Sequence, residues 1–365
     1  MFGFIPVEYY TAVYYNILLC VVLITLFRLY VMQKRIAYSN TGSFLLLTFI
    51  VLYMGLRPIN GNFFGDMGDY ATTFIRYSNG DYSYLTVGDI LYNYYVKVCS
   101  SIMQVRSWFL LTAFIYVGSM YWACKRIFLN YAFIAFLVCV TAFSFWSYGT
   151  NGIRNGMATS LFLLSLSFFE QKKNFFASTL VGILLCLLAM GIHKSIMLPF
   201  LAALLAIFYT NTRHYIYFWM ISIVLSLLAG RFWENFFGSL GFDERTSYFT
   251  NTENADLFSS TGFRWDFLLY SMVPIILGWY VVVKRKMQDK LYLLLLNTYI
   301  ISNAFWILVI RASYSNRFAY LSWFLYPIVL IYPLLKFNLW KRQNVKMSVV
   351  VFLHFLFTYV MWLIK

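Results

Sequence analysis

The stretch LYLLLLNTYIISNAFWILVI, residues 291–310, determines the fold class of this chain. It holds no charged residue, although Lys290 precedes it and Arg311 follows it. A helix of roughly 20 apolar residues is long enough to cross the hydrocarbon core of a bilayer. We therefore expect a transmembrane helix here, with one basic residue at each end.

The composition of the whole chain agrees with this interpretation. Hydrophobic residues make up 62% of the sequence and charged residues 11%, whereas a soluble domain carries roughly 25% charged residues. The apolar runs predict an all-α, polytopic integral membrane protein that forms a single transmembrane domain over residues 1–365. We predict about twelve spans, near residues 11–32, 43–57, 107–124, 129–149, 155–170, 175–192, 196–210, 215–230, 265–283, 291–310, 318–335 and 348–364.

The charged residues separate into two sets of loops on opposite sides of the predicted membrane. Short basic clusters recur between the apolar runs, and an excess of Lys and Arg is typical of cytoplasmic loops. These inner clusters lie at residues 34–35, 125–126, 172–173, 284–286 and 341–342. Most acidic residues fall in the other loops, of which two are long, 58–106 and 231–264. We therefore expect the N-terminus and these two loops outside.

One apolar segment, residues 88–105, does not fit as a span. Counting it as a crossing would place the basic cluster at 125–126 outside and invert each later cluster. As a helix, it places Leu91, Tyr94 and Val98 on one side and polar residues on the other. We expect an amphipathic helix that lies in the outer interface or enters the membrane as a re-entrant helix.

The sequence indicates no metal, cofactor or nucleic acid. The five cysteines stand singly, without CxxC pairs or histidines at ligand spacing, so we expect neither a disulfide framework nor a metal site. The net charge of +15 arises mainly from the inner clusters, which favours topology and contact with anionic membrane lipid over nucleic-acid binding. The short inner loops leave no room for a nucleotide-binding domain.

Charged residues suited to chemistry gather at the predicted outer ends of several spans. Arg57 closes one span, and Asp69 follows in the next loop. Arg154 opens a mid-chain span, and His193 ends another. Three further arginines at span ends on this side are Arg264, Arg311 and Arg317. Because these positions lie at one level in the membrane, a helical bundle could gather them around one cavity.

The motifs that contain these residues resemble those of the EpsG-like and Wzy-type bacterial polysaccharide polymerases. The matching elements are Arg57 with Gly68-Asp69-Tyr70, the sequence RNGMA at 154–158, HKS at 193–195, and the turn with Arg311, Tyr314 and RFAY at 317–320. The resemblance implies a helical bundle similar to GT-C glycosyltransferases, in the bacterial inner membrane. It also implies a protein that joins oligosaccharide repeat units linked to undecaprenyl diphosphate on the outer leaflet, with a flippase and a chain-length regulator as partners.

The residue chemistry suits such a reaction. A polyprenyl diphosphate can leave without a metal where fixed cations stabilise it, and the planar guanidinium binds phosphate oxygens in pairs. We therefore expect an inverting, metal-independent polymerisation of the donor onto the acceptor. Arg154, Arg311 and Arg317 would bind the diphosphate, and Arg264 or Arg57 would assist. Asp69 or His193 would accept the proton of the acceptor hydroxyl.

Other interpretations stay open at this point. A single arginine at a span end also fits an interfacial anchor, and His193 also fits a hydrogen-bonded helix end. A flippase for lipid-linked oligosaccharides would have two pseudo-symmetric halves, whereas the two long outer loops are unequal. A membrane acyltransferase acting on surface glycans would need an inner binding site for acyl-CoA and a catalytic histidine. The inner loops are short, and the only histidine in them is His214.

Overall fold

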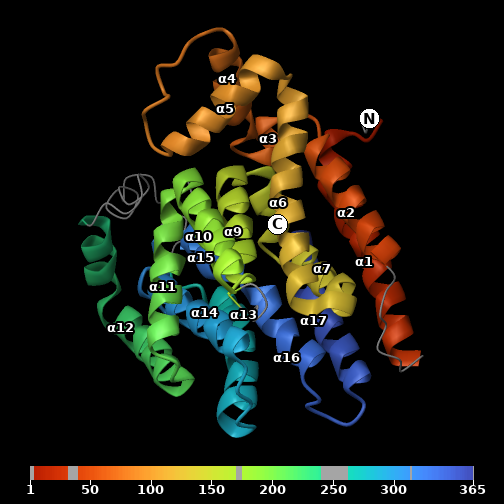
Figure 1. The fold of residues 1–365 in the computed structure, drawn as a ribbon, viewed down its shortest axis with the longest axis vertical. Helices are drawn as coiled ribbons and strands as arrows, with labels where there is room; N and C mark the ends of the chain where they lie inside the picture. The colour runs from red at the N-terminus through yellow and green to blue at the C-terminus, as the bar shows by residue number, and fades with distance from the viewer. Residues whose placement is uncertain (1–3, 32–39, 170–174, 240–261, 313–314, 365) are drawn as a thin grey trace. The chain divides into compact units, whose positions relative to one another are not determined.

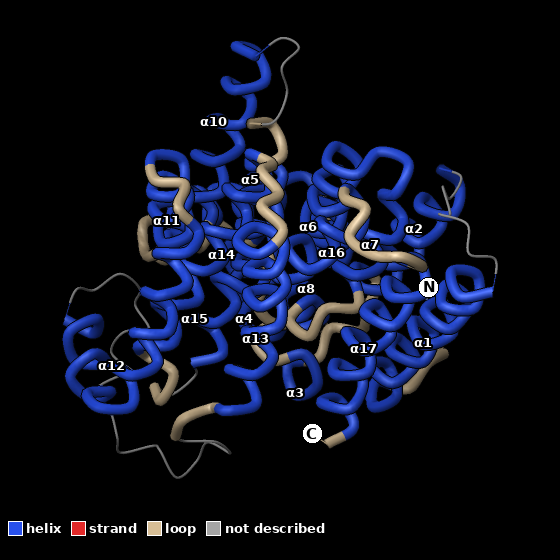
Figure 2. The backbone as a smooth tube through the Cα atoms, turned by 90° about the horizontal axis from the view of Figure 1, so that it is seen from below, coloured by secondary structure: helices blue, strands red, loops and turns tan. Residues whose placement is uncertain are grey.

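The computed structural model describes residues 4–31, 40–169, 175–239, 262–312 and 315–364. Within these ranges every regular element is helical, as Figure 2 shows, and this confirms the all-α fold class. The chain divides into two compact units. Unit 1 comprises Met1–His193 with Leu334–Lys365, and unit 2 comprises Lys194–Pro333. The prediction of one transmembrane domain stays a prediction.

Unit 1 contains most of the helices. In chain order they are α1 (Val7–Val31), α2 (Asn40–Gly55), α3 (Gly61–Phe64), α4 (Met67–Ser78), α5 (Ile90–Ile102), α6 (Val105–Phe128), the 3-10 turn η1 (Leu129–Tyr131), α7 (Ala132–Val140), α8 (Phe145–Thr150), α9 (Ile153–Leu166), α10 (Phe175–Ile192) and α17 (Gln343–Leu363). Helix α9 packs between α6 and α10 (Figure 1).

Unit 2 contains a second helical bundle. Its elements are η2 (Lys194–Ile196), α11 (Met197–Phe208), α12 (Thr212–Ser239), α13 (Trp265–Gly278), the π-helical turn η5 (Trp279–Lys284), α14 (Lys290–Leu308), α15 (Ser315–Trp323) and α16 (Tyr326–Lys336), whose last turn belongs to unit 1. Helix α14, which forms from the uncharged stretch at 291–310, packs against α11, α12 and α15. The predicted helix at 291–310 is confirmed.

Fewer helices are long enough to cross a membrane than the sequence predicts. In the described part of the chain, seven segments are long and apolar enough, and three shorter apolar helices accompany them. This agrees with a polytopic membrane protein, but the count of twelve spans is not confirmed. Residues 129–149 show one reason, because they form the short helices α7 and α8 instead of one continuous span. All residues of α7 are buried, and an apolar run buried in protein has the same pattern as one facing lipid.

Helix α1 is joined to the rest of unit 1 by tyrosine hydroxyls. Tyr10 Oη donates to the carbonyl of Tyr53 at 2.6 Å, and Tyr53 Oη donates to the carbonyl of Tyr10 at 2.8 Å. Tyr14 Oη donates to the carbonyl of Val140 at 2.8 Å. Both α1 tyrosines are fully buried. These bonds satisfy hydroxyls that would otherwise lie unpaired in apolar surroundings.

Buried side-chain amides and hydroxyls connect the helices of unit 2. Trp219 Nε1 donates to Asn303 Oδ1 at 2.8 Å, and Asn303 Nδ2 donates to Ser322 Oγ at 3.0 Å, so these bonds join α12, α14 and α15. Trp323 Nε1 donates to Ser271 Oγ at 2.7 Å and so joins α15 to α13. The network fixes the helices whose ends carry the arginines of this unit.

The helix predicted near 88–105 is present as α5, which packs against α4 (Figure 1). Its buried side consists of Tyr92, Asn93, Val96, Cys99 and Ser100. The apolar residues on the other side are exposed: Leu91, Tyr94, Val98 and Ile102. An exposed apolar face suits an interfacial helix. In the second predicted outer loop, α12 continues to Ser239, and residues 240–261 lie outside the described residues.

Candidate functional site

A buried carboxylate in unit 1 lies against two of the predicted site residues. Oδ2 of Asp89 is 3.1 Å from Nη1 of Arg154 and 3.0 Å from Nδ1 of His193. Asp89 is 5% exposed and His193 is 4% exposed, so water has little access to the contact. Three segments far apart in the sequence thus meet at one carboxylate. We call these three residues the Asp89 cluster.

The chain places each member of the cluster at a helix end. Gly88 adopts a φ of 72°, a conformation that favours glycine, and Asp89 follows it as the residue before α5. Arg154 lies in the first turn of α9. His193 directly follows α10, and its backbone N–H donates to the carbonyl of Ala189 at 3.1 Å. Helix ends leave backbone groups available, so charged side chains gathered there are well placed to meet a polar ligand.

The loop before Asp89 is held by an amide on α5. Asn93 Nδ2 donates to the carbonyls of Tyr84, Leu85 and Val87, at 2.9, 3.3 and 2.7 Å. Asn93 is 8% exposed. These three bonds fix the loop to the helix that it precedes and so hold the Asp89 carboxylate in position.

Arg154 is the more open member of the cluster. Its side chain is 27% exposed, and its Cζ lies 5.8 Å from the ring centre of Tyr70 and 5.7 Å from that of Tyr92. The guanidinium stands at the N-terminal end of α9, where the helix dipole also favours an anion. A partly exposed cation next to a helix N-terminus suits a phosphate oxygen, and Asp89 occupies only part of its hydrogen-bonding capacity.

His193 has a free ring nitrogen. Nε2 has no hydrogen-bond partner among the described residues, although the side chain is buried. Nδ1 lies within ion-pair distance of Asp89, but the two groups are not aligned well enough to form a hydrogen bond. Catalytic hydrogen bonds are often poorly aligned before substrate binds. The carboxylate faces Nδ1, and Nε2 is a buried nitrogen that could accept a hydrogen bond.

Arg57 lies in the same unit but its guanidinium is engaged with backbone carbonyls. Nη1 donates to Met54 O at 2.6 Å, and Nη2 donates to Thr150 O at 2.9 Å. The side chain is 3% exposed. Arg57 braces the end of α8, just before α9 and Arg154. Its predicted assistance to the diphosphate stays a prediction.

Asp69 lies in the first turn of α4 and is exposed. The structure brings Asp89, and not Asp69, against Arg154 and His193. Sequence reasoning missed Asp89 because it treated the residue as part of the polar side of the helix near 88–105. The available signal was the pair Gly88-Asp89 directly before an amphipathic helix, since this pair is typical of a turn into a helix. The role predicted for Asp69 stays a prediction.

The sequence profile of the EpsG family matches residues 40–365. The chain belongs to the EpsG family. No curated protein and no solved structure matches it. The range shared with the EpsG family includes every predicted site residue and Asp89, and it leaves α1 outside.

In this EpsG-family protein, unit 2 carries the other predicted arginines. Arg264 precedes α13 and pairs with Asp266 through two contacts, Nε to Oδ1 at 2.9 Å and Nη2 to Oδ2 at 2.6 Å. Its Cζ lies 3.7 Å from the ring centre of Phe267. A guanidinium that is paired and stacked within its own helix end has less capacity for a second anion.

Arg311 and Arg317 lie on either side of the turn between α14 and α15. Arg311 is exposed, and Glu234 of α12 interacts with it electrostatically. Arg317 lies in the first turn of α15 and is half-buried. Tyr314 of the same predicted motif lies outside the described residues. Within the described residues no group of three or more His, Cys, Asp or Glu could hold a metal ion.

Proposed function

We propose that this EpsG-family protein is an oligosaccharide polymerase. It would join repeat units linked to a polyprenyl diphosphate on the outer leaflet of the bacterial cytoplasmic membrane, for a surface polysaccharide. Membership of the EpsG family supports a role in polysaccharide polymerisation. The observation that carries the proposal is the Asp89 cluster, which puts a cation suited to phosphate and a histidine suited to proton transfer on one carboxylate.

The proposed reaction forms one glycosidic bond and breaks one sugar–phosphate bond. A hydroxyl oxygen of the acceptor attacks the anomeric carbon of the donor from the face opposite the diphosphate, so the configuration inverts. The electron pair of the broken bond stays on the diphosphate, which leaves as an anion. The hydroxyl proton passes to Nε2 of His193. Neither transfer requires a metal or nucleotide where a cation and a base are fixed in place.

Arg154 is proposed to stabilise the leaving diphosphate. Its guanidinium is fixed by Asp89 and lies near the rings of Tyr70 and Tyr92, so little reorganisation is needed when charge develops on the phosphate oxygens. Arg311, Arg317 and Arg264 are retained as predicted diphosphate ligands from the sequence. Of these, Arg311 is the most exposed residue, whereas Arg264 is already paired with Asp266.

His193 is the better supported of the two predicted bases. It is buried beside a carboxylate, and Asp89 can hold the ring and stabilise the imidazolium that proton transfer creates. Asp69 is an exposed carboxylate at the start of α4, where water competes for its oxygens. We therefore assign the proton transfer to His193 and keep Asp69 as the alternative.

The test uses the lipid-linked oligosaccharide that accumulates in the host strain when this chain is deleted. Purified protein in detergent should convert this lipid into a ladder of longer glycans and release polyprenyl diphosphate. His193→Ala should abolish the ladder, whereas His214→Ala, which removes an exposed histidine hydrogen-bonded to Tyr209, should not. A flippase gives no product without two leaflets, so a lack of any ladder from active, folded protein would contradict the proposal.

A further inference from the structure

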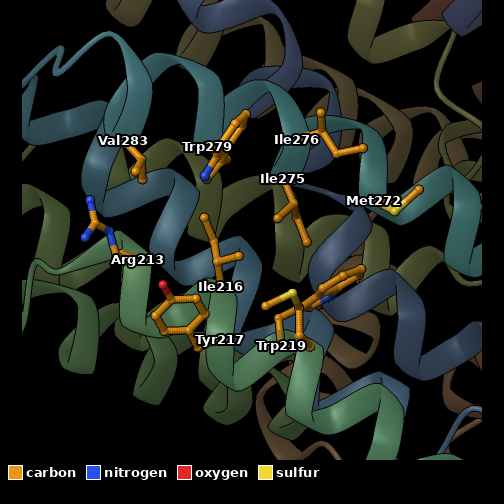
Figure 3. Close-up of a pocket in the computed structure, with 10 residues that line it drawn as sticks. Arg213, Ile216, Tyr217, Trp219, Met272, Ile275, Ile276, Trp279 and Val283 are labelled. Carbon is orange, nitrogen blue, oxygen red and sulfur yellow. The ribbon is translucent and has the colours of Figure 1, made fainter.

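A groove in unit 2 lies apart from the Asp89 cluster in the sequence and has no part in the proposed reaction. It has a volume of about 490 Å³ and lies between α12 and the continuous segment of α13 and η5, as Figure 3 shows. Trp219 and Ile275 form a buried floor, at 4% and 3% exposure. Ile276 and Trp279 stand at the walls and are 52% and 44% exposed. The groove is therefore open along one side and apolar along its length.

The two ends of the groove differ in polarity. Arg213 lies at one end, beside Tyr217 and Val283, and Met272 lies at the other end (Figure 3). Arg213 begins one candidate span, and η5 ends another, so the polar end of the groove lies at the ends of two spans. Arginine, tyrosine and tryptophan at span ends are typical of the membrane interface. This polarity is that of an amphiphile with its headgroup beside Arg213.

The charge at the polar end is positive. Val283 lines the groove, and the next three residues, Lys284, Arg285 and Lys286, are exposed cations. No acidic residue occurs among the described residues that line the groove. The nearest acid in this stretch, Asp289, accepts hydrogen bonds from Tyr292 N and Tyr332 Oη, both at 2.8 Å. Its carboxylate is thus engaged within the bundle.

The wall that carries Trp279 and Val283 is the π-helical turn η5. Its wider turn gives the bond from Arg285 N to the carbonyl of Tyr280, at 2.9 Å. π-helical turns are rare, and many of them lie at functional sites. Here the turn forms one side of a groove that is apolar at one end and basic at the other.

We propose that the groove binds an anionic glycerophospholipid. Its phosphate would lie at Arg213 and the cations that follow Val283, and an acyl chain would lie along Ile216, Met220 and Ile276. Basic pockets between membrane helices bind anionic lipid headgroups, and each basic residue near the surface contributes about 1 kcal/mol. The bound lipid would fix α12 against α13. By the predicted topology, it would come from the inner leaflet.

The experiment measures lipids retained by the purified full-length protein, by native mass spectrometry in detergent. Phosphatidylglycerol and phosphatidylcholine with identical acyl chains are added in turn. We expect phosphatidylglycerol to bind more tightly, and Arg213→Gln to weaken it about fivefold, which is the loss of one such cation. Lys125→Gln removes a half-buried cation in the last turn of α6, in unit 1, and should leave the affinity unchanged.

A second variant tests whether the apolar part of the groove, and not only its charge, contributes to lipid binding. Ile276→Trp places a larger ring in the groove at a residue that is already exposed, so the fold should tolerate it. It should weaken phosphatidylglycerol binding to the same low level as phosphatidylcholine. Equal binding of both lipids by the unchanged protein would overturn the proposal, as would tighter binding of a polyprenyl phosphate. Formation of a dimer that Ile276→Trp disrupts would also overturn it.

Discussion

Nδ1 of His193 lies 3.0 Å from Oδ2 of Asp89, so the end of α10 and the start of α5 share one buried carboxylate. The same oxygen lies 3.1 Å from Arg154, which makes Asp89 the common partner of the proposed base and the proposed phosphate ligand. A substitution at Asp89 therefore tests both roles without touching either residue directly.

Asp89→Asn keeps the size of the side chain and removes its charge. We expect elongation at saturating donor to fall about a hundredfold, because the imidazole loses the group that orients it and stabilises its protonated form. The apparent donor affinity should change less, since Arg154 keeps its charge. The measurement is the rate of ladder formation by purified protein, with Asp81→Asn, an exposed loop acid, as the control. A normal rate at saturating donor would remove Asp89 from the mechanism.

Arg317→Lys tests a predicted diphosphate ligand of unit 2. Lysine keeps the charge but loses the paired hydrogen bonds that a guanidinium gives to phosphate. If Arg317 binds the leaving group, elongation should fall about a hundredfold, equivalent to about 2–4 kcal/mol of transition-state stabilisation. Protein level and melting temperature should hardly change. Arg231→Lys, at an exposed arginine of α12, is the matched control, and elongation near its rate would show that Arg317 only anchors its helix.

Arg57→Lys should mainly reduce stability. Lysine cannot reach both the carbonyl of Met54 and that of Thr150, so one buried carbonyl loses its partner. Such a loss costs about 1–3 kcal/mol. We expect a lower melting temperature in detergent, with activity per folded molecule reduced far less than in His193→Ala. Arg106→Lys changes an exposed arginine and should leave the melting temperature unchanged. An inactive but fully stable Arg57→Lys protein would instead place Arg57 at the substrate.

Gly156→Ala tests the close approach of α9 to α8. A Cβ at Gly156 would lie 2.7 Å from the backbone carbonyl oxygen of Tyr148, which cannot move without shifting α8. Overpacking of this kind costs about 1–3 kcal/mol, and here it would also displace the start of α9 with Arg154. Gly118→Ala is the matched control, because its Cβ would meet the ring of Phe114 at an ordinary 3.8 Å. Equal melting temperatures for the two variants would refute this account.

Accessibility labelling tests the predicted topology, on which an outer reaction depends. Single cysteines at Asp81 and Arg285, both exposed, would be placed in a variant without the five native cysteines. An impermeant thiol reagent applied to intact cells should label the cysteine at 81 and spare the one at 285, because the basic cluster at 284–286 is expected inside. The reverse pattern would move the Asp89 cluster to the wrong side for the proposed substrate.

The sequence was informative where a pattern has one structural meaning. The uncharged stretch at 291–310 forms α14, and the amphipathic pattern near 88–105 forms α5. It was less informative where apolar runs are buried in protein, as in α7. A helix that packs against other helices and a helix that faces lipid both consist of apolar residues, so their sequences look alike. This ambiguity accounts for the predicted span at 129–149, whereas three further predicted spans, near 43–57, 175–192 and 196–210, form apolar helices shorter than the seven long segments.

The candidate site shows the same limit at the level of single residues. Arg154 and His193 were predicted separately from their positions at helix ends, and the structure places both against one carboxylate. The pair Gly88-Asp89 marks a turn into a helix, but the choice between Asp89 and Asp69 as the partner of Arg154 and His193 depends on how α5 packs against α10. Such a choice rests on contacts between distant segments, which spacing along a chain does not encode.

The tyrosine bonds of α1 have a consequence for the order in which the protein assembles. Helix α1 is synthesised before its partners, since the residue that pairs with Tyr10 follows 43 positions later and the one that pairs with Tyr14 follows 126 positions later. Until then both hydroxyls need temporary partners in the bilayer. Helix α1 can therefore complete these bonds only after α7 has been synthesised. A chain that ends before residue 140 lacks the carbonyl that Tyr14 needs, so its α1 would keep one buried hydroxyl unpaired.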